Sequence, residues 1–435
     1  MLHTLADTAV LGADWLRLER RKARRLPRKS GSRHLALFAW ALPPTSTVGV
    51  FRPLSFMRYG SQLGWRIDAF CSKAPDALSE HGDELLARVP RETVMHVVPP
   101  QSREPSYRFF PRVDGGFTNA LAYARHAIAT MAHDPPDVVL ASGPPFFTFV
   151  AALLVTRHFG VPFVLDYRDE WTECPFDFVT KTGHDRAWER RCLRAADAVL
   201  FTTESHVRHQ LATFPELDAA RTHFLPNGWE PEDFADHEHE APVTRSPAST
   251  TVRIAHIGNL PVHKSPHDFL ASLRQLLTDE PEWVPRIRAQ FVGRRGGSSD
   301  RALHSFEFPT AIEVVDHVGK HEANRRMQES DVLLLLSGPG GERYLNAKLF
   351  DYVAARRPIL AFGTPGESSA LIERLGVGVH GPAGSAAALR DALERLGRLD
   401  MSRNDERVSD WLHAHRRDVL ASRAFEIIES VTVRT

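Results

Sequence analysis

The stretch that decides the fold is DVVLASGPPFFTFVAALLVTRHFGVPFVLDYRDEWT, residues 137–172. It holds a short β-rich apolar run at 137–141, an apolar segment of helical length at 146–159 and a second β-rich run at 163–167. A strand, a helix and a second strand in this order predict a βαβ unit with two parallel strands. Because Ser-Gly-Pro-Pro at 142–145 interrupts the apolar residues, we predict no membrane-spanning helix here.

The same alternation continues on both sides of this stretch. Further strands are expected at 34–40, 66–71, 198–202 and 223–225, with a helix at 186–195. A polar segment rich in Pro, Ser and Thr follows at 236–251 and has the composition of a linker. Beyond it, strands are expected at 253–257, 288–292, 313–315, 331–336 and 358–362, and helices at 266–277, 323–329, 345–354 and 386–396.

These patterns predict two α/β domains of the Rossmann-like kind, each built on a parallel sheet, at 34–240 and 251–403. A basic extension, 1–33, precedes them. A long helix at 406–431, within a last segment at 404–435, is expected to cross back to the first domain. Ligands of open parallel sheets bind outside the carboxyl ends of the strands, so we expect the two sheets to face an interdomain cleft.

The composition excludes several classes of protein. With 435 residues, 43% of them hydrophobic and 25% charged, the chain is neither disordered nor collagen-like. Lys plus Arg equals Asp plus Glu at 54 each, so we expect no nucleic-acid partner. The three cysteines fit neither a disulfide framework nor a zinc site, which favours a cytoplasmic location. No spacing of His, Asp and Glu indicates a metal site.

The N-terminal extension carries a strong local charge. Between Arg17 and Lys29 there are eight Lys or Arg residues and one acid. Leu11, Trp15 and Leu18 recur at helical spacing. This pattern is typical of a basic amphipathic helix that lies on an anionic membrane surface, and a solvated or self-docked tail explains it equally well. Peripheral attachment to the inner face of a membrane therefore stays an open expectation.

Several common catalytic motifs are missing from the sequence. It contains no G-x-G-x-x-G after the first strand and no G-x-x-x-x-G-K-[ST], which removes the main support for a dehydrogenase or a P-loop kinase. It also contains no G-x-S-x-G and no H-E-x-x-H.

The remaining motifs form a collinear set. They are PPTSTVGVFR at 43–52, the stretch 137–172 with Asp166, Tyr167, Arg168, Asp169 and Trp171, CLRAADAVLFTTES at 192–205, LPNGWEPEDF at 225–234, RIAHIGNLPVHKS at 253–265, VGKHEANRRMQESDVLLLLS at 318–337 and NAKLFDYVAARRPILAFG at 346–363. Because these motifs follow one another in this order over about residues 34–380, the chain resembles GT-B glycosyltransferases of family 4, the glycogen-synthase and mannosyltransferase clan. The resemblance is to a subgroup with a D-[FY]-R-D-x-W signature.

The resemblance implies a fold and an activity. The N-terminal domain would take an acceptor and the C-terminal domain a nucleotide-diphosphate sugar, either a UDP-sugar or a GDP-sugar. The sugar would be transferred to an acceptor hydroxyl with retention and without a metal or other cofactor. Acceptors implied by this activity include a saccharide, a lipid-linked saccharide and a small molecule, as in glycoconjugate or natural-product biosynthesis.

On the donor side, the central expectation is a cation beside the diphosphate. Lys264 follows the strand end at Gly258, where a cation and backbone amides can neutralise a departing diphosphate. Many relatives carry an Arg after this glycine, and here the residue is Asn259. The other residues expected at the donor are Gly49, Val318, Gly319, Gly340, Gly341, Glu342, Lys348 and Asp351.

Two alternatives remain open at the donor sugar. Many relatives have two glutamates separated by seven residues. Asp351 occupies the second position, and counting back eight positions places the first on Arg343 with Glu342 beside it. Lys348 either reaches the phosphates or forms an i,i+3 ion pair with Asp351.

On the acceptor side, the expected residues are Thr47, Arg168, Asp169, Trp171 and Thr203. Arg168 stands where many relatives place a histidine near the reacting carbon, and Asp169 lies beside it. These two residues, with Lys264 and Glu342, are the catalytic candidates. Such a pair would orient an acceptor hydroxyl or bind an anionic acceptor. Alternatively, Arg168 pairs only with Asp166 or Asp169, Gly49 is an ordinary turn residue, and Thr203 caps a loop.

Two other functions share this fold. One is a non-catalytic pseudo-glycosyltransferase that binds a sugar nucleotide, which the departures at Asn259, Arg343 and Asp351 favour. The other is a sugar-nucleotide 2-epimerase, for which no acid and base pair is identifiable.

Overall fold

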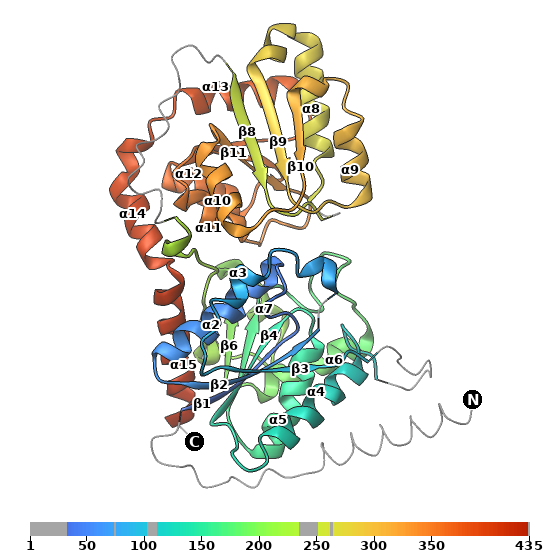
Figure 1. Cartoon of the computed structure of the whole chain (residues 1–435), viewed down its shortest axis with the longest axis vertical. Coiled ribbons are helices and arrows are strands. Elements are labelled where there is room, and N and C mark those ends of the chain that lie inside the picture. The colour runs from blue at the N-terminus through green and yellow to red at the C-terminus, as the bar shows by residue number, and fades with distance from the viewer. Residues whose placement is uncertain (1–32, 74, 102–110, 235–250, 262–263, 434–435) are drawn as a thin grey trace, which may run out of the picture. The chain divides into compact units, whose positions relative to one another are not determined.

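The computed structural model describes residues 33–73, 75–101, 111–234, 251–261 and 264–433. The chain divides into two compact units (Figure 1): unit 1 comprises Met1–Pro226 and Leu420–Thr435, and unit 2 comprises Asn227–Val419. The predicted N-terminal helix and all but the last residue of the predicted linker at 236–251 lie outside the described residues.

Unit 1 is built on a seven-stranded parallel sheet in the order β3-β2-β1-β4-β5-β6-β7. Its strands are β1 (His34–Ala39), β2 (Arg66–Ser72), β3 (Val94–Val98), β4 (Val138–Gly143), β5 (Phe163–Tyr167), β6 (Ala198–Phe201) and β7 (Thr222–Phe224). Its helices are α2 (Phe51–Gln62), α3 (Asp83–Leu86), α4 (Phe117–Thr130), α5 (Phe147–Phe159), α6 (Gly183–Ala195), α7 (Glu204–Thr213) and, from Leu420 onward, α15 (Arg417–Val433).

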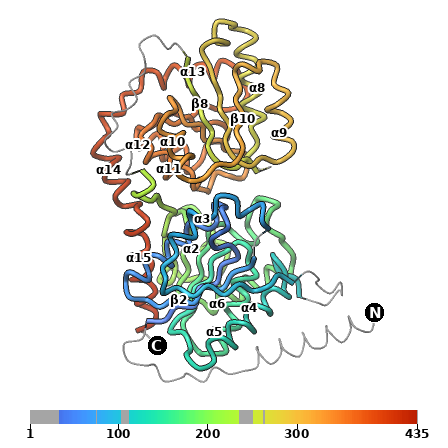
Figure 2. Tube along the Cα trace, viewed as in Figure 1, coloured from blue at the N-terminus to red at the C-terminus, as the bar shows by residue number. Residues whose placement is uncertain are grey.

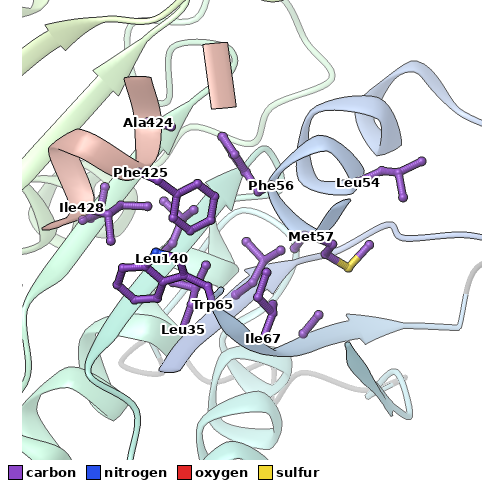
Figure 3. Close-up of a cluster of buried hydrophobic side chains, with 14 of the residues drawn as sticks. Leu35, Leu54, Phe56, Met57, Trp65, Ile67, Leu140, Ala424, Phe425 and Ile428 are labelled. Atoms are coloured by element: carbon purple, nitrogen blue, oxygen red, sulfur yellow. The ribbon is translucent and has the colours of Figure 1, made fainter. Parts of the chain in front are cut away.

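Helices cover both faces of this sheet, so its strands are apolar on both sides. On one face, side chains of α2 and α15 pack over the central strands, and Phe425 lies against Trp65 (Figure 3). On the other face, α4 and α5 contribute aromatic rings, including Tyr123 against Phe38. The end of the chain is therefore part of the core of unit 1.

Unit 2 is built on a six-stranded parallel sheet in the order β10-β9-β8-β11-β12-β13. Its strands are β8 (Val252–Ile257), β9 (Ile287–Val292), β10 (Ile312–Val315), β11 (Val332–Ser337), β12 (Ile359–Gly363) and β13 (Gly378–Gly381). Its helices are α8 (His267–Asp279), α9 (Gly297–His304), α10 (Lys320–Glu329), α11 (Lys348–Ala354), α12 (Glu367–Leu375), α13 (Ala386–Gly397) and α14 (Asp405–Ala414). One core contains side chains of α8, α9 and α13, and the other contains side chains of α10, α11, α12 and α14.

Two strands escape the sequence patterns. The edge strand β3, VMHVV, is a short apolar run that the sequence analysis did not single out, and only its last residue, Val98, is buried. The edge strand β13, GVHG, is half glycine, a residue that disfavours strands. Each is held in place by a parallel neighbour, β2 or β12.

The single helix predicted at 406–431 is wrong, because the chain forms two helices, α14 and α15, that can be followed along the trace in Figure 2. The break lies where the backbone of Trp229 inserts: its N–H donates to the His415 carbonyl, and its own carbonyl accepts from the Arg417 N–H. These bonds replace helical ones, so a contact distant in sequence ends α14. In the described part of the chain, no helix combines the length and apolarity needed to cross a membrane.

Candidate active site

The end of β8 in unit 2, with the turn that follows it, lies against the first residue of α11. Lys348, the first residue of α11, donates from Nζ to His256 Nε2 over 2.6 Å and to the Asn259 carbonyl over 3.0 Å. Gly258 has φ +116°, and a Cβ there would lie 2.7 Å from Lys348 Cε. A glycine is therefore needed both for the turn and for the passage of the lysine stem.

The electrostatics of this group are unusual. Burial, followed by the positive charge of Lys264, holds the pKa of Lys348 well below its usual range, and an anion bound beside the amine would raise that pKa and favour the charged form. Burial, followed by the charge of Lys348, holds the pKa of His256 well below its usual range, so the imidazole is neutral. Lys264 is thus within electrostatic reach of both residues, as expected for two cations at one anion site.

Asn259 stands where a second cation was expected, and its side chain has a structural contact. Asn259 Oδ1 accepts from the Arg294 N–H over 3.2 Å. The β8 and β9 turns also touch closely, because a Cβ on Gly293 would lie 2.8 Å from the Gly258 carbonyl carbon. Asn259 therefore joins the two turns while its carbonyl holds Lys348.

Asp351 pairs with Lys320 and not with Lys348. Lys320 Nζ lies 2.6 Å from Asp351 Oδ2 and 3.7 Å from Asp233 Oδ2. The other oxygen, Asp351 Oδ1, is buried and accepts no hydrogen bond from any described residue. The i,i+3 ion pair considered for Lys348 is thus not formed, and Asp351 keeps an acceptor for a hydroxyl group.

Val318 and Gly319 lead directly into α10. Gly319 is the N-cap residue of that helix and is buried, whereas Val318 is partly exposed. Because Lys320 is the first residue of α10, this turn also fixes the cation that binds Asp351.

The loop after β11 folds back on itself. The Gly340 N–H donates to Glu342 Oε1 over 3.1 Å, and Gly340 has φ +85°. The Gly341 N–H donates to the Gly338 carbonyl over 3.2 Å. Glu342 is exposed and Arg343 is partly buried, so the carboxylate is the more accessible of the two side chains.

In unit 1, Arg168 binds carbonyl groups of neighbouring turns. Its Nη1 donates to the Gly49 carbonyl over 2.8 Å, its Nε to the Gly143 carbonyl over 3.2 Å, and its Nη2 to the Pro144 carbonyl. A Cβ on Gly49 would lie 2.4 Å from Arg168 Nη1. Gly49 therefore makes room for the guanidinium, and Arg168 ties β4 and β5 to the first helical turn.

Asp166 has a different partner from the one considered in the sequence. It is fully buried and accepts from Arg52 Nε over 2.8 Å and from Ser142 Oγ over 2.7 Å. Arg52 Nη1 also donates to the Pro226 carbonyl over 2.7 Å. Asp166 of the D-Y-R-D segment thus forms an ion pair with Arg52.

The other expected acceptor residues differ in exposure. Trp171 is fully buried, stacks on Phe146 and donates from Nε1 to Asp185 over 3.2 Å. Thr203 is fully buried and caps α7 by accepting from the His206 N–H over 2.9 Å. Asp169 and Thr47 are partly exposed.

Two carboxylates on α6 hold the loop that carries Arg168 and Asp169. Glu189 Oε2 accepts from the Thr172 N–H over 3.1 Å and from its hydroxyl. Asp185 Oδ1 accepts from Trp171 Nε1 over 3.2 Å and from the Asp114 N–H over 2.7 Å. Burial raises the pKa of Glu189 to about 8. Both acids fix the acceptor-side loop from beneath.

Sequence reasoning missed four residues that the structure makes prominent: His256, Lys320, Arg52 and Glu189. His256 had one usable signal, because it is the polar residue in the otherwise apolar end of a strand, two positions before a glycine. The partners of the other three lie far away in sequence. Among the described residues, no group of three His, Cys, Asp or Glu side chains could hold a metal ion.

Comparison with known proteins agrees with this architecture. Residues 52–228 match the family described as glycosyl transferase 4-like domain. Sucrose-phosphate synthase from Thermosynechococcus elongatus superposes with a TM-score of 0.69 at 12% identity, over 93% of this chain and 100% of that chain. The chain has the GT-B fold.

Two other solved structures are similar at low identity. Anabaena HepE in complex with UDP has a TM-score of 0.62 at 13% identity, over 92% of this chain and 100% of that chain. The α,α-trehalose-phosphate synthase (UDP-forming) from Burkholderia vietnamiensis has a TM-score of 0.63 at 14% identity, over 92% and 100%. No curated protein matches the sequence significantly. These likenesses concern the fold, which agrees with the predicted pair of Rossmann-like parallel-sheet domains.

Proposed function

We propose that the protein transfers a sugar from a nucleotide-diphosphate sugar to an acceptor hydroxyl. The observation that carries this proposal is the end of β8, where Lys348 Nζ is buried, has no carboxylate partner among the described residues and lies within reach of the charge of Lys264. A departing diphosphate supplies the negative charge that such a site lacks. The match of 52–228 to a glycosyl transferase 4-like domain supports the same activity.

The donor would occupy unit 2. Gly258, Asn259, Lys264 and Lys348 would bind the diphosphate, and Asp351 would accept from the ribose hydroxyls through its unpartnered oxygen. The backbone at Val318 and Gly319 would contact the base, and the loop with Gly340, Gly341 and Glu342 would contact the sugar. The similar structures include one in complex with UDP and one of a UDP-forming synthase, which favours a UDP-sugar, with a GDP-sugar as the alternative to test.

The acceptor would be bound through unit 1. Asp169 and Thr47 would contact it, and Gly49, Arg168, Trp171 and Thr203 would shape the turns that present them. A saccharide, a lipid-linked saccharide or a small molecule with a free hydroxyl fits this chemistry.

The reaction would retain the configuration at the anomeric carbon. The bond from that carbon to the donor phosphate oxygen breaks, and the acceptor oxygen forms the new bond on the same face. The acceptor proton passes to an oxygen of the departing diphosphate, whose charge Lys264 and Lys348 stabilise. Positioning and electrostatics would supply most of the rate enhancement, so no metal is required in this mechanism.

Calorimetric titration with UDP and GDP, followed by a donor hydrolysis assay, tests the proposal. We expect binding of one nucleotide, turnover of its sugar conjugates that persists in EDTA, and loss of most turnover in Lys264→Ala. The exposed Lys73 of unit 1 offers a matched control, Lys73→Ala, which should behave as wild type. Binding without turnover across a broad donor and acceptor panel would favour a pseudo-glycosyltransferase, and absence of nucleotide binding would reject the assignment.

The basic N-terminal extension would hold the enzyme at an anionic membrane surface, a proposal that rests on its sequence. Its eight cations between Arg17 and Lys29 suit anionic headgroups. Co-sedimentation with anionic vesicles should be strong for the full chain and weak for a chain that lacks 1–33. Equal binding by both would reject the extension as an anchor.

A further inference from the structure

His256 is a buried polar side chain that the catalytic scheme above does not use. It lies near the end of β8, is 1% exposed, and its two ring nitrogens have different partners. Nδ1 lies 3.0 Å from the Leu334 carbonyl on β11, and Nε2 lies 2.6 Å from Lys348 Nζ.

These contacts define one tautomer. A carbonyl oxygen only accepts, so Nδ1 carries the hydrogen and donates it to Leu334. Nε2 then has a lone pair toward Lys348 and accepts from its ammonium. The low pKa of His256, caused by burial and by the charge of Lys348, agrees with a neutral ring.

Lys348 is held by neutral acceptors, so a bound anion would be the group that stabilises its charged form. Its ammonium has three N–H donors, of which two go to His256 and to the Asn259 carbonyl. Among the described residues, no carboxylate lies within ion-pair distance of Nζ, and the nearby acid Asp351 is engaged by Lys320. Gly258 confines the stem, because its missing Cβ leaves the space that Lys348 Cε occupies.

We propose that His256 is a positioning residue that aims the Lys348 ammonium at the donor diphosphate. The inference rests on the proposed function, since it assumes that the anion bound at the end of β8 is a nucleoside diphosphate. Two neutral acceptors fix the direction of the ammonium and leave its charge and one N–H for the ligand. An acidic partner in place of His256 would neutralise the charge that the site needs.

Calorimetric titration of the full chain with UDP, GDP and the matching nucleosides tests this role. His256→Phe keeps a ring of similar size and removes the acceptor, so we expect about a tenfold loss of diphosphate affinity, about 1.4 kcal/mol, with nucleoside affinity unchanged. His256→Gln restores an acceptor and should recover part of the loss. His304→Phe, on the exposed side of α9, serves as the control and should bind as wild type.

A double-mutant cycle shows whether His256 acts through Lys348. The effects of His256→Phe and Lys348→Met should be strongly non-additive, because the second change removes the group that the first one positions. Additive effects, or unchanged diphosphate affinity in His256→Phe, would overturn the inference. Failure of wild type to bind any nucleoside diphosphate would instead reject the proposed function.

A measurement on unaltered protein covers the case in which His256→Phe does not fold. Nitrogen chemical shifts of the protein labelled with ¹⁵N-histidine should show a ring with hydrogen on Nδ1 and an unprotonated Nε2 that shifts when UDP or GDP is added. The signal is assigned by its loss in His256→Gln. A hydrogen on Nε2, or an Nε2 shift that does not respond to a bound nucleotide, would contradict the role.

Discussion

Replacing Glu189 with glutamine should stabilise unit 1 at neutral and alkaline pH. Glu189 is fully buried beneath the loop that follows β5 and accepts two hydrogen bonds from Thr172. Burial raises its pKa from 4.5 to about 8, so the folded protein keeps a proton that the unfolded chain loses. Glutamine has the same shape and an amide oxygen that can accept from Thr172, and it has no proton to lose.

The size of the effect follows from the two pKa values. Below pH 4.5 both states hold the proton, and the stability associated with Glu189 is fully present. Between pH 4.5 and about 8 only the folded state holds it, so unfolding releases a proton. The free energy of unfolding then falls by about 1.4 kcal/mol for each pH unit, or about 5 kcal/mol across the window.

Urea unfolding at several pH values measures this dependence. Hydrogen exchange of the peptide that contains α6 restricts the readout to unit 1. The difference in unfolding free energy between Glu189→Gln and wild type should rise steadily from pH 5 to 8 and then level off. The exposed Glu92 provides the control, and Glu92→Gln should show no such rise. A difference that stays constant with pH would refute the account of Glu189.

Three further predictions concern buried charges and the β8 turn. Arg52→Met should lower the free energy of unfolding by about 3–5 kcal/mol because it leaves Asp166 buried and unpaired, and adding Asp166→Asn should recover part of it in the same urea assay. Gly258→Ala should reduce diphosphate affinity at least about tenfold by calorimetry, since a Cβ would displace Lys348; unchanged affinity would contradict that contact. Burial by itself would raise the pKa of Asp68, but hydrogen bonds and charges from His34 and His96 outweigh it and hold this pKa well below its usual range. Its stabilising contribution is therefore present at neutral pH and lost as pH falls through the lowered pKa, so acid unfolding followed by circular dichroism should be less steep in Asp68→Asn.

Much of the fold could be predicted from the sequence because buried parallel strands are continuous apolar runs. The strand predicted at 163–167 coincides with β5, and the helix at 146–159 differs from α5 by one residue. The edge strand β13 could not be found in this way because two of its four residues are glycine, whereas β3, VMHVV, is an apolar run that the sequence analysis overlooked. The split between α14 and α15 depends on Trp229, whose position no local pattern reveals.

The candidate site could be located in part. The order of motifs pointed to Lys264 and Lys348, and the structure brings both within electrostatic reach of one turn. Local spacing suggested Asp351 as the partner of Lys348, but the nearest acceptor is His256, which is 92 residues away in sequence. The end of β8 and the start of α11 meet only in the folded chain, and a local sequence pattern does not contain that information.

A structure of the full chain with the nucleoside diphosphate that it binds, UDP or GDP, tests the central claim most directly. We predict diphosphate oxygens within hydrogen-bond distance of Lys348 Nζ at the end of β8, with Lys264 beside them and the ribose hydroxyls at Asp351 Oδ1. The same structure would show whether Glu342 or Arg343 faces the sugar position. A nucleotide bound elsewhere in the chain, with Lys348 still held only by His256 and Asn259, would contradict the account.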